Sequence, residues 1–234
     1  MTKKIGIMQP YFFPYIGYWQ LIKAVDEFVI YDDVNYIKQG WINRNNILLN
    51  GNKHLITLPF DKASSFLLIN QVKITSNDNL KQKLLRTIEQ AYKKAPYFDN
   101  VFSIIQAVVM EESCFISNAL INQFKLVNNY LDIKTKLIVS SDITKDNELK
   151  AQDKVIHICK LLSGTDYINA IGGQELYSKS DFEQNKLKLN FIKTKDINYL
   201  QFKNEFVPSL SIIDVMMFNS PEKINEMLDK YELL

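Results

Sequence analysis

The chain has few of the residues on which catalysis most often depends. Its 234 residues include only two histidines, two cysteines and seven glycines. Cys114 and Cys159 lie in apolar helical contexts without C-x-x-C spacing, so we expect two buried free thiols, which fits a reducing cytoplasm. The sequence has no Walker-type lysine loop, G-x-G-x-x-G, G-x-S-x-G or H-E-x-x-H pattern. These absences argue against the corresponding enzyme classes, and no metal site is predicted.

Long apolar runs and a strong charge imbalance are also missing. No stretch of about 18 or more apolar residues occurs, so no membrane span is expected. The opening residues lack the charged and apolar regions of a secretory signal, which favours a cytoplasmic location. The net charge is +2, with lysines and acids interspersed, so no nucleic-acid partner is expected. With 47% hydrophobic residues the chain can bury a substantial core, and we predict one domain over 1–234.

The most informative segment, Ile5–Ile47, has the pattern of a βαβ unit. A strand over Ile5–Met8 is expected to stop at Gln9-Pro10, because proline cannot donate to a sheet. A helix over Tyr18–Val25 follows, then a buried strand over Phe28–Tyr31. In open α/β sheets ligands bind beyond the carboxyl ends of the strands. We therefore expect a ligand site around the loop that follows Met8.

Arg44 is the leading candidate for binding an anion. Only two of the 28 basic residues are arginine, and a guanidinium grips phosphate or carboxylate bidentately where lysine offers a point charge. A structural pairing of Arg44 with Asp32 or Asp33 is the alternative. The other candidate substrate ligands of this segment are Gln9, Tyr11, Tyr18, Lys38, Trp41, Asn43 and Asn45.

Three residues are candidates for catalysis. Asn50-Gly51 predicts a hairpin turn that would present His54 near Arg44, and an imidazole is suited to taking a proton from an ammonium group. A half-exposed strand histidine is the alternative. The carboxylates Asp32 and Asp33 are suited to binding an amino group or a metal ion, or else they only cap a strand end.

The remainder of the chain alternates between strands and helices. Residues 80–132 are predicted to be a helical insertion that either forms a lid over the site or only packs against the core. The segment after it is predicted to have strands over 135–139, 167–171 and 187–193, a helix over 151–163 and a helical tail over 211–233. Asn169, Gly172 and Gly173 follow a strand, where the glycines permit either a close approach of ligand or a tight turn.

Four segments resemble the WbqC-like family, which is found in gene clusters for O-antigen and other surface polysaccharides. The segments are IGIMQPYFFPYIGYWQLIKAVDEFVIYDDVNYIKQGWINRN (5–45), AYKKAPYF (91–98), TDYINAIGG (165–173) and FVPSLSIIDVMMFN (206–219). The resemblance implies modification of amino sugars, such as attachment of a glycyl or other acyl group to the amine of a deoxyaminosugar.

A weaker resemblance is to the nucleotidylyltransferases that carry a His-x-Gly-His tetrad at a helix start. The corresponding residues here are Tyr15-Ile16-Gly17-Tyr18, so both histidines are replaced. Tyrosine, with a pKa of about 10, supplies no cation near neutral pH. This resemblance therefore implies a fold, an α/β Rossmann-like (HUP/nucleotidylyltransferase-like) parallel sheet with a helical insertion, rather than an activity.

The expected substrate is a dTDP- or UDP-linked amino sugar. An N-acyl or aminoacyl transferase would need an activated donor, and a coenzyme A thioester, an acyl carrier protein thioester and an ATP-derived adenylate all stay open. The alternatives are a non-catalytic sugar-nucleotide binding or assembly protein and an ATP-using nucleotidylyltransferase-like enzyme. The sequence does not choose an oligomeric state.

Overall fold

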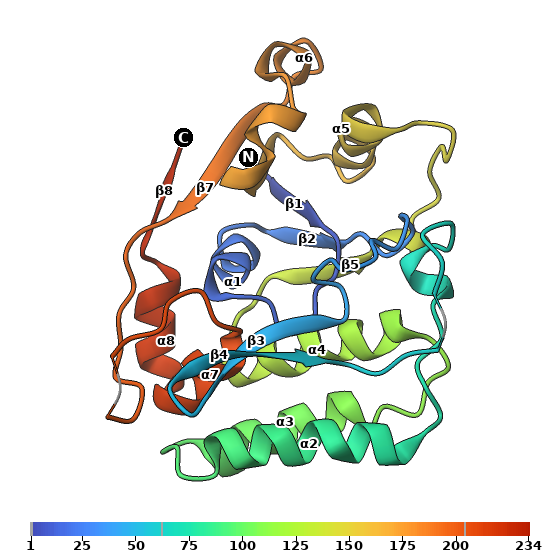
Figure 1. Cartoon of the computed structure of the whole chain (residues 1–234). Helices are drawn as coiled ribbons and strands as arrows, with labels where there is room; N and C mark the ends of the chain where they lie inside the picture. The colour runs from blue at the N-terminus through green and yellow to red at the C-terminus, as the bar shows by residue number, and fades with distance from the viewer. Residues whose placement is uncertain (1, 62, 204) are drawn as a thin grey trace.

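The computed structural model describes residues 2–61, 63–203 and 205–234, and its centre is a six-stranded sheet (Figure 1). The strand order is β5-β2-β1-β6-β7-β8, and every neighbouring pair is parallel except β7 and β8. The strands are β1 (Lys4–Met8), β2 (Glu27–Ile30), β5 (Lys136–Val139), β6 (Asp166–Ala170), β7 (Lys188–Thr194) and β8 (Tyr231–Leu233). The predicted Rossmann-like α/β class is confirmed.

The strand order places a topological switch at the centre of the sheet. From β1 the chain moves outward through β2 to β5, then crosses back to β6 on the other side of β1. The loops after β1 and β6 therefore diverge at their carboxyl ends. Such a divergence opens the crevice in which α/β proteins bind their ligands.

Helices cover both faces of the sheet. They are α1 (Ile16–Lys23), α2 (Asp78–Tyr92), α3 (Phe98–Val109), α4 (Ile116–Tyr130), α5 (Ala151–Leu161), α6 (Lys179–Gln184), α7 (Ile212–Phe218) and α8 (Pro221–Leu228). Figure 1 shows α5 and α6 on one side of the sheet and the other helices on the opposite side. Alternate residues of β1 face the two helix layers. Ile5 and Ile7 pack in the hydrophobic cluster that contains residues of α5, whereas a Cβ added at Gly6 would meet the Phe28 ring on the other face.

A two-stranded hairpin lies outside the main sheet. It consists of β3 (Arg44–Leu49) and β4 (Asn52–Thr57), joined through Asn50 and Gly51 with φ of 51° and 77°. Positive φ at both central residues is the requirement of a type I′ turn, which Asn-Gly favours. The predicted hairpin is confirmed.

The predicted helical insertion over 80–132 corresponds to α2, α3 and α4. Phe124 of α4 lies stacked on Tyr18 with ring centroids 5.5 Å apart, and its ring lies 5.4 Å from that of Trp19. The block is thus joined to α1 through the main hydrophobic core. Its action as a lid stays a prediction.

Two expectations about the chain are wrong. The segment 211–233 is not one helical tail, because it contains α7, α8 and then β8, whose residues pair with Ile192 to Thr194 of β7. Cys159 is buried as expected, whereas Cys114 is exposed, and both are free thiols. Within the described residues, no helix combines the length and apolar character that crossing a membrane requires.

Candidate functional site

The loop after β1, residues 9–15, is held by side chains from distant elements. Gln123 of α4 accepts a hydrogen bond from the Phe13 amide at 2.7 Å, and its amide group donates to the Tyr11 carbonyl at 2.9 Å. Nδ2 of Asn45 donates to the carbonyls of Phe12 and Phe13 at 3.1 and 2.8 Å. Both polar side chains are buried. The loop is therefore preorganised by contacts that only the folded chain supplies.

Phe13 is the strained residue of this loop. Its φ of 41° lies in the left-handed region, which costs a non-glycine residue about 1–3 kcal/mol. Its side chain is fully buried, and its carbonyl also accepts from the Ser211 hydroxyl at 2.6 Å. These contacts hold the turn that directs Tyr11 and Tyr15 toward the surface.

Two adjoining cavities lie beside this loop, and we call them together the Tyr15 groove. The first, about 370 Å³, follows the carboxyl end of β7, and the second, about 280 Å³, lies between the loop and the hairpin. Both are lined by Tyr15 and Ser209. The first is also lined by Ile16, Thr194–Tyr199, Phe206, Pro208, Leu210 and Val215, and the second by Tyr11, Pro14, Trp41 and Asn45.

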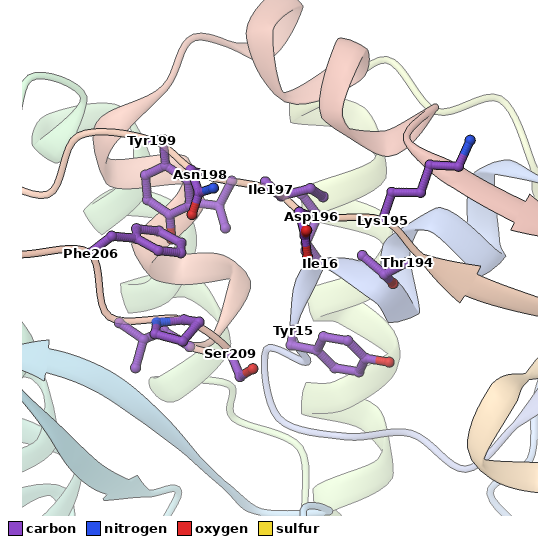
Figure 2. Close-up of a pocket in the computed structure, with 13 residues that line it drawn as sticks. Tyr15, Ile16, Thr194, Lys195, Asp196, Ile197, Asn198, Tyr199, Phe206 and Ser209 are labelled. Atoms are coloured by element: carbon purple, nitrogen blue, oxygen red, sulfur yellow. The ribbon is translucent and has the colours of Figure 1, made fainter.

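Tyr15 forms the shared wall of the groove. Its ring packs against Gly17, where an added Cβ would stand 2.5 Å from Cε2 of the ring and 2.6 Å from Thr194 Oγ1. Figure 2 shows Tyr15 and Thr194 on the same side of the groove. Only glycine allows this packing. Burial raises the pKa of Tyr15 above its ordinary value, so its hydroxyl is a neutral hydrogen-bond donor.

The first cavity reaches the amino end of α1. This helix begins at Ile16, and no side chain caps its first amides. The amino end of a helix carries a partial positive charge that attracts anions. Lys195 and Asp196 are exposed residues of the same cavity, and Figure 2 shows the Lys195 side chain extending away from the other labelled residues. The arrangement is suited to a ligand that carries a phosphate.

A buried polar network supports the wall opposite Tyr15. Asp214 of α7 is fully buried and accepts hydrogen bonds from the hydroxyls of Tyr92 and Tyr199, each at 2.7 Å, and from Nε2 of Gln201 at 2.6 Å. The Tyr92 hydroxyl accepts in turn from the Leu48 amide at 2.8 Å. Burial raises the pKa of the Asp214 carboxyl, and the three donors act in the opposite direction. The network ties the cavity residue Tyr199 to α2, α7 and the hairpin.

The structure brings together three of the candidate binding residues predicted from the sequence. Tyr11, Trp41 and Asn45 line the same cavity of the groove. The side-chain amide of Asn45, however, already donates its hydrogen bonds to the carbonyls of the loop after β1. The Trp41 side chain is 46% exposed and its carbonyl accepts from the Phe12 amide at 3.1 Å. Trp41 and Tyr11 are therefore fixed in place yet open to a ligand.

Three other candidates have structural contacts. Tyr18 is buried in the core, where its hydroxyl donates to the Gln9 carbonyl at 2.7 Å. Gln9 itself is partly buried at the end of β1. Asn43 is buried, accepts from the Tyr36 hydroxyl at 2.9 Å and donates to the Leu58 carbonyl at 3.2 Å. The polar groups of Tyr18 and Asn43 are thus already satisfied within the protein.

Arg44 holds the turn that precedes the hairpin. Its Nε donates to the Gly40 carbonyl at 2.8 Å, and its terminal nitrogen donates to the Gln39 carbonyl. The guanidinium lies 6.0 Å from the centre of the Trp41 ring. The alternative pairing with Asp32 or Asp33 is wrong, because those carboxylates are bound by Ser141 and Lys145.

We expect Arg44→Lys to lower the free energy of unfolding more than it lowers ligand affinity. Lysine cannot reproduce two donors aimed at the Gly40 and Gln39 carbonyls, and each lost bond is worth about 1–3 kcal/mol. Urea denaturation and calorimetric titration with a nucleotide-linked sugar measure the two quantities. A variant that keeps its stability but loses affinity would show instead that Arg44 clamps the ligand.

The two adjacent carboxylates at the end of β2 have separate partners. Asp32 is buried and accepts from the Ser141 amide at 3.0 Å and from the Ser141 hydroxyl at 2.7 Å. Asp33 pairs with Lys145 at 2.7 Å. Burial acts to raise the pKa of Asp33, but the Lys145 ammonium, the Ser140 hydroxyl and the charge of Lys154 together outweigh it and leave the pKa below its ordinary value. Neither carboxylate lines the Tyr15 groove.

Lys38 and His54 are both exposed, and neither lines the groove. His54 pairs across the hairpin with Ile47. A catalytic role for His54 stays a prediction that requires a ligand to reach the outer part of the hairpin.

Asn169, Gly172 and Gly173 form a compact turn after β6. Asn169 is buried and accepts from the Ala170 amide at 2.9 Å. An added Cβ at Gly173 would stand 2.4 Å from the Asn169 side-chain nitrogen, whereas one at Gly172 would meet no heavy atom within 4 Å. Gly173 is therefore required for packing, and Gly172 leaves its backbone open.

This difference predicts opposite outcomes for two matched substitutions. Gly173→Ala should lower the free energy of unfolding by about 1–3 kcal/mol, because overpacking displaces the buried Asn169. Gly172→Ala should be neutral or slightly stabilising. The alanine meets no clash in the folded protein, and it lowers the conformational entropy of the unfolded chain. Thermal denaturation of both variants measures the effect, and equal losses would contradict the packing role.

Sequence reasoning did not identify Asp214, Lys145, Lys154 or Ser209. Asp214 lies inside the apolar run FVPSLSIIDVMMFN, where a lone carboxylate was a signal of a buried polar network. The lysines lack such a signal, because 28 basic residues are spread over the chain.

The fold is that of a Rossmann-like α/β protein, and the Tyr15 groove is a candidate ligand site at the carboxyl edge of its sheet. The WbqC-like protein family matches residues 9–226, and the chain belongs to this family. A relative described as the uncharacterized protein Rv1507c of Mycobacterium tuberculosis is 28% identical over 222 residues, which cover 93% of this chain and 94% of the relative. No solved structure matches the chain. Family membership suggests a role in surface-polysaccharide biosynthesis.

Proposed function

We propose that the Tyr15 groove binds a dTDP- or UDP-linked amino sugar and that the protein transfers an acyl or aminoacyl group, such as glycyl, to the sugar amine. The observation that carries this proposal is the groove itself, in which aromatic rings of Tyr11, Tyr15 and Trp41 stand beside the uncapped amino end of α1. Aromatic rings suit a base or sugar face, and a helix amino end suits a diphosphate.

Acyl transfer to an amine requires an acceptor for the ammonium proton. Asp196 is the one carboxylate among the described residues that line the groove. We assign it the roles of holding the sugar ammonium by charge and of accepting its proton, in place of His54. The amine then forms the C–N bond to the acyl carbon as the bond from that carbon to the donor breaks. A thioester donor leaves as the thiol, which takes up the proton, and an adenylate donor leaves as AMP. The neutral hydroxyls of Tyr15 and Ser209 are the candidate donors to the oxyanion that develops on the acyl carbon.

The test combines binding and turnover. Calorimetric titration with dTDP- and UDP-amino sugars should show binding. The affinity should be higher than that of the same nucleotides without the amino sugar. Incubation with glycyl, acetyl or longer acyl donors, offered as coenzyme A thioesters, carrier-protein thioesters or ATP with the free acid, should then give an N-acylated sugar nucleotide by mass spectrometry. Binding without product from any donor would support a non-catalytic receptor instead.

The receptor function is the second candidate. It is favoured by the exposed position of His54 outside the groove, which leaves a carboxylate as the candidate base. A carboxylate is a weaker base than an imidazole for an ammonium group. Asp196→Asn distinguishes the two functions, because it should abolish turnover by an enzyme but only weaken binding by a receptor.

A further inference from the structure

A second cavity lies at the carboxyl ends of β2 and β5, and we call it the lysine cavity. Its volume is about 670 Å³, which is in the range of small-molecule sites. It is lined by Tyr31, Asp33, Val34, Asn35, Leu68, Ser141, Ile143, Lys145, Asn147, Leu149, Lys150, Ala151 and Lys154. None of these residues lines the Tyr15 groove.

The lysine cavity has an excess of positive charge. Three lysines and one aspartate are the charged residues that line it, so two positive charges are left over. Lys145 is committed to protein partners, since it pairs with Asp33 and donates to the Ser140 carbonyl. Asp33 therefore neutralises Lys145, and the charges of Lys150 and Lys154 face the cavity without a carboxylate of their own.

Lys154 is the residue that points to a ligand. It is only 8% exposed, yet its ammonium donates no hydrogen bond to any part of the chain that the structure describes. Its contacts are an ion pair with Asp33 at 4.0 Å, beyond hydrogen-bond length, and the face of the Tyr31 ring 5.8 Å away. The ammonium group of Lys154 is open to the cavity, where its unused donors are available to an acceptor.

The surroundings of Lys154 are suited to a phosphate. The helix α5 begins at Ala151 on the cavity wall with no side chain capping its first amides, so its positive end adds to the lysine charges. Tyr31 and Asn35 add neutral donors on the same wall, whereas the amide and hydroxyl of Ser141 already donate to Asp32. Burial and the Asp33 charge raise the pKa of Tyr31, so its hydroxyl keeps its proton. Asp153, in the same turn of α5, does not line the cavity.

We propose that the lysine cavity is a second anion site that binds a phosphate dianion through Lys150, Lys154 and the amino end of α5. The phosphate is either free or the terminal phosphate of a larger molecule such as coenzyme A or ATP. The site requires nothing of the Tyr15 groove, and it holds whether or not the groove binds a sugar nucleotide.

The test uses inorganic phosphate, coenzyme A and ATP as separate probes on the full chain. NMR of ¹⁵N-labelled protein should show shifts of the Ala151–Lys154 amides that saturate with at least one probe and weaken with salt. Lys154→Met should weaken that binding by about tenfold or more, the effect of losing a hydrogen bond to a charged group. The Lys154 side chain donates no hydrogen bond within the described part of the chain, and methionine keeps the backbone amide that donates to Lys150, so this variant is expected to fold.

Two further variants complete the test. Lys160→Met changes an exposed lysine of the same helix outside the cavity and should bind as the wild type does. Lys150→Met removes an exposed cavity lysine and should weaken binding in the same direction as Lys154→Met even if the latter is unstable.

Saturation by inorganic phosphate alone assigns a free-anion site, and saturation only by coenzyme A or ATP assigns a phosphorylated ligand. Absence of saturation with all three probes, or wild-type affinity in both the Lys150→Met and the Lys154→Met variant, overturns the proposal.

Discussion

Asp214→Ala is expected to lower the free energy of unfolding by about 3–5 kcal/mol, because it removes one acceptor from three buried donors and each unsatisfied group costs about 1–3 kcal/mol. The donors are the hydroxyls of Tyr92 and Tyr199 and the amide of Gln201. They belong to α2 and to the segment before α7, so the loss disconnects elements that are far apart in the sequence. Urea denaturation followed by circular dichroism measures the change.

Single-bond variants provide the matched comparison for Asp214→Ala. Tyr199→Phe removes one hydroxyl and leaves the carboxylate with two donors, so a smaller loss of about 1–2 kcal/mol is expected. Tyr199 also lines the Tyr15 groove, so this variant should weaken ligand binding, whereas Tyr92→Phe should affect stability alone. If Asp214→Ala costs no more than Tyr199→Phe, the carboxylate does not organise the network.

Tyr15→Ala and Trp41→Ala should each weaken the binding of a nucleotide-linked amino sugar by about tenfold to a hundredfold, because stacking of a base on an aromatic ring is worth roughly 1–3 kcal/mol. Both side chains are partly exposed, at 42% and 46%, so little folding energy depends on them. Calorimetric titration measures affinity, and thermal denaturation confirms that the variants are folded.

An exposed aromatic outside the groove is the control for these variants. Phe66 is 89% exposed and does not line the Tyr15 groove. Phe66→Ala should therefore leave affinity unchanged. Equal losses in all three variants would mean that the effect is general, and unchanged affinity in Tyr15→Ala and Trp41→Ala would place the ligand elsewhere.

Local patterns in the sequence predicted most of the elements. The βαβ unit, the Asn50-Gly51 hairpin and the helices α2 to α5 follow from apolar periodicity and turn residues, which act over a few neighbouring positions. The strand β8 was missed because Tyr231–Leu233 has three residues and becomes a strand only by pairing with β7. Whether a short segment at a sheet edge forms a strand depends on the strand it pairs with, and the neighbouring residues in the sequence do not show that pairing.

The candidate site was predicted less completely, for a physical reason. The sequence pointed to the loop after β1 and to Trp41, because a loop at the carboxyl end of a strand follows from local pattern and topology. It did not show that Asn43, Asn45 and Arg44 donate their hydrogen bonds to carbonyls of the protein, since those carbonyls belong to residues 4 to 33 positions away. Nor did it show that Ser209 and residues 194–199 complete the groove.

The most direct measurement is a crystal structure of the protein soaked with a dTDP- or UDP-linked amino sugar. We expect the ligand in the Tyr15 groove, with an aromatic face of the nucleotide or sugar against Tyr15 or Trp41, the diphosphate at the amino end of α1 and the amine near Asp196. Density for the ligand at the outer part of the hairpin around His54, or in the lysine cavity with the groove empty, would contradict the assignment of the groove as the sugar-nucleotide site.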